Sequence, residues 1–92
     1  MSAMHAYAPA GTVSYRMQLS KAAMGVGEKQ GGLNKPRIKR VLLWAVDQGI
    51  VPYDRVYEAQ SGRGDKERSS EEMRATLRLH LAAIINAMRA TA

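Results

Sequence analysis

The sequence predicts a mostly α-helical fold: a small single domain with one short N-terminal β-strand (or hairpin) and three to four helices. The chain has 92 residues, which is the length of one domain. Its hydrophobic share of 46% is ordinary for a globular protein. One short run alternates with a period of two, and two well-capped segments follow the helical period. We expect residues 1–11 to be a flexible N-terminus and residues 12–92 to form the domain.

Residues 12–19 alternate polar and apolar side chains, which is typical of a half-buried strand. The apolar members, expected to face a core, are Val13, Tyr15, Met17 and Leu19. Ser20 could then cap a short helix. Glycines at 25, 27, 31 and 32 each cost close to 1 kcal/mol in a helix, so a helix over residues 20–32 stays an open alternative.

The central helix is predicted over residues 36–48. Asn34 is a favourable N-cap, Pro36 suits the first turn, and Gly49 suits the position after the C-cap. The apolar face consists of Ile38, Val41, Leu42, Ala45 and Val46, widened by Trp44. Together with the predicted N-terminal strand, this helix forms the basic strand and helix part of the domain, residues 12–49.

The C-terminal half predicts a short helix over residues 53–60, a polar loop over 61–69 and an amphipathic helix over 70–90. Ser69 and Glu72 have the spacing of a capping box. The stripe Met73, Leu77, Leu81, Ile84 and Met88 follows the helical period. We expect a core that includes Val41, Leu42, Trp44, Ala45, Leu77, Leu81 and Ile84.

The composition argues against several classes of protein. The chain has no cysteine, its longest apolar run is only residues 41–46, and its first residues lack the pattern of a signal peptide. We therefore expect a soluble, cytoplasmic protein. The two histidines have no metal-ligand or catalytic spacing and the glycine-rich stretch is no P-loop, so we expect no enzyme, metal or cofactor. The tripeptide Arg63-Gly64-Asp65 matches a cell-adhesion motif, and we interpret this match as chance.

Positive charge is concentrated at the N-terminal side of the chain. Residues 1–40 contain seven cations and one anion, whereas residues 41–92 contain seven of each, so the whole net charge of +6 lies in the first part. This asymmetry predicts a contact with a polyanion.

The segment GGLNKPRIKR, residues 31–40, places four cations where a helix begins. A helix N-terminus disfavours cations because the peptide dipoles leave a partial positive charge there. A phosphate or an acidic partner would stabilise this arrangement. The candidate nucleic-acid or partner-binding residues are Arg16, Gln18, Lys21, Lys29, Asn34, Lys35, Arg37, Lys39 and Arg40.

Two DNA-binding architectures resemble parts of the chain. With a strand at 12–19 and a helix introduced by Asn34, the sequence looks like a ribbon-helix-helix repressor, although Gly25 and Gly27 would fall in its first helix. That resemblance implies base contacts by Arg16 and Gln18 and a phosphate clamp at the second helix.

Residues 20–35 are also similar to a phage-repressor helix-turn-helix. Ala23, Gly27 and Leu33 have the spacing of that motif, while Gly31, Gly32 and Pro36 depart from it. The predicted function is a small basic nucleic-acid-binding regulator (DNA or RNA) of phage or mobile-element type, expected to form a homodimer through the N-terminal strand or the last helix.

The alternative is a small phage-type inhibitor of host machinery, as anti-CRISPR proteins are. This alternative rests on size, composition and the absence of cysteine. The basic segment would then bind an acidic protein surface or a guide RNA. Neither function predicts a membrane or a small-molecule substrate as a partner.

Overall fold

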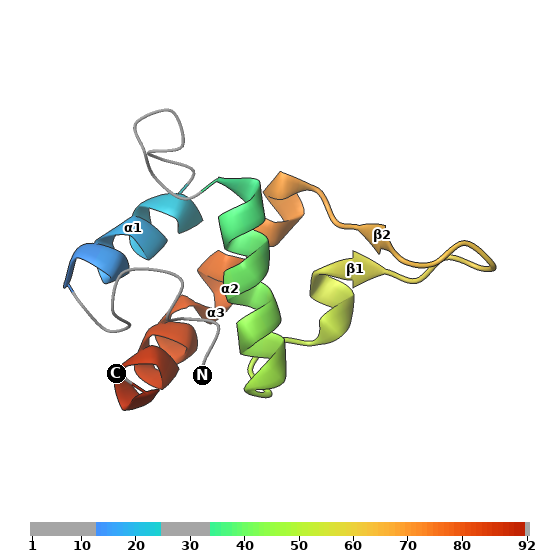
Figure 1. The fold of residues 1–92 in the computed structure, drawn as a ribbon. Coiled ribbons are helices and arrows are strands. Elements are labelled where there is room, and N and C mark those ends of the chain that lie inside the picture. The colour runs from blue at the N-terminus through green and yellow to red at the C-terminus, as the bar shows by residue number, and fades with distance from the viewer. Residues whose placement is uncertain (1–12, 25–33, 92) are drawn as a thin grey trace.

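The structure, a computed structural model, describes residues 13–24 and 34–91 of the chain. These residues form the helices α1 (Val13–Ala23), α2 (Lys35–Asp47) and α3 (Ser70–Thr91), and a 3-10 turn η3 (Tyr53–Arg55). A two-stranded antiparallel sheet consists of β1 (Tyr57–Glu58) and β2 (Lys66–Glu67) (Figure 1). The predicted mostly helical single domain is confirmed.

The N-terminal element is a helix, so the predicted strand over residues 12–19 is wrong where the structure describes it. In α1 the buried residues are Leu19, Ala22 and Ala23, which follow a helical spacing, while Met17 is 53% exposed. A strand must pair its backbone groups with a neighbouring strand, whereas a helix satisfies them within itself. Because the only strand pair among the described residues is β1 with β2, α1 has no strand partner.

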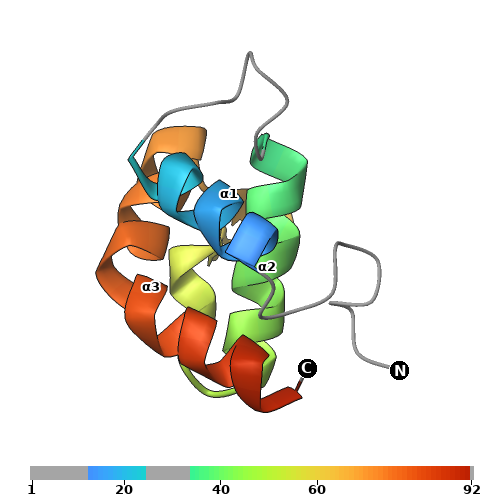
Figure 2. The same ribbon diagram turned by 90° about the vertical axis from the view of Figure 1, so that its left-hand side faces the viewer.

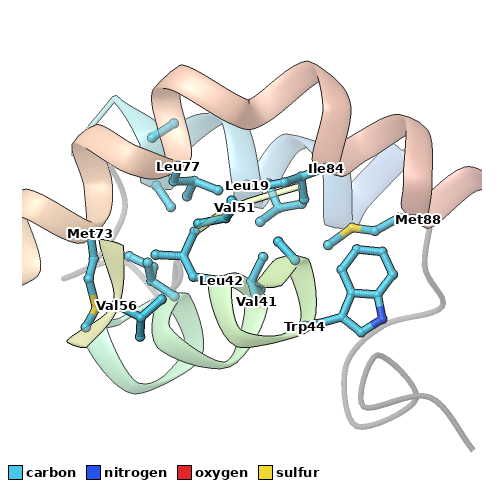
Figure 3. Close-up of a cluster of buried hydrophobic side chains, with 14 residues drawn as sticks. Leu19, Val41, Leu42, Trp44, Val51, Val56, Met73, Leu77, Ile84 and Met88 are labelled. Carbon is cyan, nitrogen blue, oxygen red and sulfur yellow. The ribbon is translucent and has the colours of Figure 1, made fainter. Parts of the chain in front are cut away.

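The core lies between α3 and the two N-terminal helices. Both α1 and α2 pack on α3, with α1 on one side of the molecule and the hairpin projecting from the other (Figures 1 and 2). Figure 3 shows Leu42 and Val41 of α2 pointing toward Leu77 and Ile84 of α3. Of the expected core residues Val41, Leu42, Trp44, Ala45, Leu77 and Ile84 are buried, and Leu81 is partly buried against the same cluster.

The predicted helix caps are present. The Asn34 side chain accepts a hydrogen bond from the backbone N–H of Arg37 at 3.2 Å and begins α2 one residue before the expected start. At the other end Gly49 has φ 75°, and the N–H of Ile50 donates to the carbonyl of Ala45 at 2.9 Å. This pair of features is a Schellman cap, which glycine permits because it has no Cβ.

The segment expected to be a helix over residues 53–60 instead forms η3 and β1, so this prediction is wrong. After the turn, Val56 is fully buried and fixes the chain against the core. Tyr57 then pairs with Glu67, and Glu58 pairs with Lys66. The predicted polar loop over 61–69 therefore contains β2. The paired residues are separated by a polar loop, and each strand has only 2 residues, which is too short to show a period of two in the sequence.

Candidate nucleic-acid interface

The predicted cationic segment forms the first turns of α2 from Lys35 onward, while Lys29 and residues 31–33 lie outside the described residues. Two of its cations share one anion. Lys35 Nζ lies 2.9 Å from a carboxylate oxygen of Glu67, and Lys39 Nζ lies 2.7 Å from the other oxygen. Glu67 belongs to β2, so the hairpin supplies an acidic partner for the beginning of α2.

These ion pairs change the titration of both partners. Hydrogen bonds from Lys39, and then from Lys35, lower the pKa of the Glu67 carboxyl. The hydrogen bond to Glu67 raises the pKa of Lys39. The three side chains are still about one-third exposed, at 36%, 31% and 33% for Lys35, Lys39 and Glu67. Solvent therefore screens the pairs, and their contribution to stability is modest.

The unfavourable placement of Lys35 and Lys39 against the helix dipole is thus offset within the chain. No external phosphate is required to stabilise these two side chains. A phosphate that bound them would first have to displace or share Glu67. The expected contact of Lys35 and Lys39 with nucleic acid consequently has an intramolecular competitor.

Arg37 and Arg40 project from another side of α2. Successive helical residues are rotated by about 100°, so Arg37 lies on the far side of the helix from Lys39, and Arg40 lies between them. Both arginines are exposed. In the part of the chain that the structure describes, Arg37 has no ion pair with an acidic residue. Among the predicted contacts on α2, Arg37 is therefore the cation most available to an external anion.

The backbone at the start of α2 has little capacity left for an anion. Asn34 uses its side-chain oxygen as the N-cap, and this bond occupies the N–H of Arg37. Pro36 has no N–H, and the N–H of Ile38 donates to the carbonyl of Asn34 at 3.0 Å. An anion would therefore be bound here by arginine and lysine side chains rather than by a row of free amides.

On α1, the predicted residues Arg16, Gln18 and Lys21 occupy different parts of the helix surface. Lys21 is exposed in the last turn, and Arg16 and Gln18 are half-exposed. Two helical residues that are two apart lie about 200° from each other, so Arg16 and Gln18 lie on opposite edges. Because α1 is a helix, it does not form the two-stranded ribbon that would have placed Arg16 and Gln18 on DNA bases. Arg16, Met17, Ser20 and Lys21 line a shallow depression on the outer face.

The cations of α1 and of the beginning of α2 belong to one end of the molecule. Figures 1 and 2 both show α1 beside the N-terminal half of α2. The C-terminal end of α1 is fixed by Arg78 of α3, whose Nη1 donates to the carbonyl of Ala23 at 2.9 Å. Residues 13–24 and 34–46 contain no acidic residue, and their cations are Arg16, Lys21, Lys35, Arg37, Lys39 and Arg40.

Sequence reasoning missed the roles of Glu67 and Arg68. Arg68 Nε donates to the carbonyl of Asp54 at 2.9 Å, and Nη1 lies 3.6 Å from Glu58 and 3.4 Å from Glu72. Arg68 thereby joins η3, the hairpin and α3. Both residues lie in a stretch that was predicted to be a polar loop. The only related signal in the sequence is the alternating charge of Lys66, Glu67 and Arg68, which does not identify the residues that Glu67 and Arg68 pair with.

Other kinds of site find no support in the described residues. No group of three or more histidine, acidic or cysteine side chains there is placed to hold a metal ion. None of the helices described is both long and apolar enough to cross a membrane. Comparison with protein-family models, with curated proteins and with solved structures finds no match.

Proposed function

We propose that the protein binds nucleic-acid phosphates through the exposed cations of α1 and of the first turns of α2. The central residues are Lys21 and Arg37, which are exposed, and Arg16, which is half-exposed. One observation carries the proposal: this end of the molecule has cations and no acidic residue in its described segments, whereas Glu67 faces Lys35 and Lys39 from the hairpin side. Cations that are exposed and have no acidic neighbour attract an external polyanion most strongly.

The binding is proposed to be independent of base sequence. Lysine and arginine contacts to phosphates fix a protein on nucleic acid but carry little sequence information. The base contacts expected of Arg16 and Gln18 required a strand ribbon, and α1 is a helix. A small regulator of phage or mobile-element type fits this mode of contact. DNA is the first ligand to test, and RNA is the second.

The test is a comparison of charge-reversed variants that have the same net charge. The double variant Lys21→Glu with Arg37→Glu is expected to lose most of its affinity for a duplex, measured by fluorescence anisotropy. Each lost phosphate contact also lowers the slope of log affinity against log salt by about 0.9 for duplex DNA. The control reverses Arg63 and Lys66, two exposed cations of the hairpin with no ion pair among the described residues.

The control variant is expected to bind nucleic acid almost as tightly as the wild type. Equal loss in both variants would mean that only net charge matters and would contradict a defined site. Absence of binding by the wild-type protein to both DNA and RNA at low salt would contradict the proposal altogether.

A second function is favoured by the hairpin, which projects from the helices with residues 58–66 exposed (Figure 1). A projecting, solvent-exposed loop is a suitable element for contact with another protein. The alternative proposal is therefore an inhibitor that binds a host protein or ribonucleoprotein complex. A pull-down from host lysate separates the two functions. Nuclease treatment would abolish recovery of partners by a nucleic-acid binder but would leave a direct protein complex intact.

A further inference from the structure

Over about four helical turns, from residue 75 to residue 90, the outer face of α3 is uncharged except at its edge, where exposed Arg78 donates to the carbonyl of Ala23. The exposed residues on this face are Ala75, Leu79, Ala82, Ala83, Asn86 and Ala90. Leu79 is 76% exposed, more than any other large hydrophobic side chain that the structure describes. The solvent-facing side of an amphipathic helix usually carries charged residues. This face therefore has the character of a helix–helix contact surface.

Four of these residues have the spacing that surrounds a side chain from a second helix. Leu79, Ala82, Ala83 and Asn86 stand at positions i, i+3, i+4 and i+7, which is the arrangement of a hole in knobs-into-holes packing. Small alanine side chains allow the backbone of a second helix to approach closely. A leucine from that helix would fill the hole, and Leu79 itself is a leucine at the centre of the face.

The charges at the two ends of the face complement each other. Glu71 and Arg89 are 18 residues apart, which is five full turns of an α-helix, so both lie on the same edge of α3. Both are exposed, and within the described part of the chain neither has an ion pair. In a dimer whose two-fold axis is perpendicular to both copies of α3, the two helices are antiparallel. The same edge of each helix then lies on the same side of the interface. This arrangement would therefore bring Glu71 of one copy to Arg89 of the other.

We propose that α3 is the interface of an antiparallel homodimer, in which Leu79 of each copy inserts between Ala82 and Ala83 of its partner. This single register also places the two Glu71–Arg89 pairs at the ends of the interface. Because the opposite face of α3 packs on α1 and α2, the pairing leaves the cationic end of each copy uncovered. The dimer does not depend on the proposed binding of nucleic acid.

The association is expected to be weak, since one pair of helices buries less than the roughly 1,200 Å² of a stable interface. The dimer dissociation constant is measured by sedimentation equilibrium at protein concentrations from about 10 µM to about 1 mM, without nucleic acid. Leu79→Lys is expected to raise the dimer dissociation constant about tenfold or more. Met17→Lys, which replaces an exposed apolar residue of α1, is the control and should leave the constant unchanged. Circular dichroism confirms that both variants remain folded.

Charge exchange tests the direction of the pairing. Glu71→Arg and Arg89→Glu should each weaken the dimer, and the double variant should restore it. A dimer that Leu79→Lys leaves intact, or a protein that stays monomeric at about 1 mM, would overturn the proposal. A double variant that dimerises no more tightly than the single variants would overturn the antiparallel register.

Cysteine cross-linking gives an independent reading of the register, because the chain has no native cysteine. In the proposed pairing the two copies of residue 82 lie about 4 Å apart along the helix axis, whereas the two copies of residue 75 lie about 17 Å apart. Ala82→Cys should therefore form a disulfide-linked dimer on oxidation, and Ala75→Cys should not. Efficient cross-linking at 75 as well as 82 would indicate a parallel pair and contradict the proposal.

Discussion

Glu67 on β2 lies 2.7 Å from the Nζ of Lys39 in α2, and its second oxygen lies 2.9 Å from Lys35. One carboxylate of the hairpin thus neutralises part of the cationic helix start. The remaining cations on the α1 side keep their positive potential. The hairpin therefore decides which of the predicted basic residues are available to an external phosphate.

Removing this carboxylate should strengthen nucleic-acid binding. Glu67→Gln leaves Lys35 and Lys39 free to contact phosphates, so the affinity for duplex DNA should rise. The salt slope should become steeper by as much as about 1.8 if both lysines gain a phosphate. Salt-dependent anisotropy titrations measure both quantities. Glu58→Gln, which removes the same charge from β1 beside Arg68, is the matched control. An equal effect of the two substitutions would show that binding depends only on the net charge of the protein and not on the position of Glu67.

Acidification should weaken the fold through Glu67. Its lowered pKa means that the ion pairs stabilise the folded state above the usual glutamate value of 4.5. This contribution is lost as the pH falls through the lowered pKa. Chemical denaturation from neutral pH to about pH 3 should therefore show a smaller acid loss for Glu67→Gln than for the wild type. Parallel loss in the two proteins would assign acid sensitivity to other groups, such as Glu72.

Cavity formation in the core should be costly, whereas truncation of the α3 outer face should not. Leu42 is fully buried, so Leu42→Ala is expected to lower the free energy of unfolding by about 2–5 kcal/mol. Leu79→Ala, at an exposed site, should change it by less than about 0.5 kcal/mol in dilute monomer. Urea denaturation measures both values. A loss below about 1 kcal/mol for Leu42→Ala would contradict the packing of α2 on α3.

The cap of α3 should contribute measurably to stability. Ser69 Oγ accepts a hydrogen bond from the Glu72 N–H at 3.2 Å, and the Ser69 N–H donates to the Glu72 carboxylate at 3.3 Å. Ser69→Ala is expected to cost about 1 kcal/mol. Ser69→Asp should retain most of the stability because an aspartate can also cap the helix. Thermal unfolding of both variants, with Ser61→Ala in the exposed loop as the control, tests this cap. No difference between Ser69→Ala and the control would contradict its role.

The sequence predicts correctly those elements whose start and end signals are each local in the sequence. Asn34 and Gly49 delimit α2, and the Ser69–Glu72 pair begins α3, because each cap depends on residues within a few positions. The N-terminal strand was predicted wrongly since a short alternating run also fits a helix. Burial of Leu19, Ala22 and Ala23 against α3 decided the outcome, and that contact is not local.

The candidate site could be predicted only in part for the same reason. The concentration of cations before residue 41 is visible in the sequence. Which of these cations are paired depends on the hairpin, because Glu67 of β2 pairs with Lys35 and Lys39 and leaves Arg37 exposed. The two strands are each 2 residues long and follow buried Val56, so no alternating pattern in the sequence predicts them.

The most direct test of the central claim is a titration of the labelled protein with a short DNA duplex, followed by two-dimensional NMR. The account predicts that amide shifts concentrate in residues 16–24 and 34–40, where the cations have no acidic neighbour on the same segment. The tip of the hairpin, residues 59–65, should change little. The shifts should collapse in the Lys21→Glu, Arg37→Glu variant. Shifts centred on residues 59–65, with α1 and the start of α2 unaffected, would contradict the account.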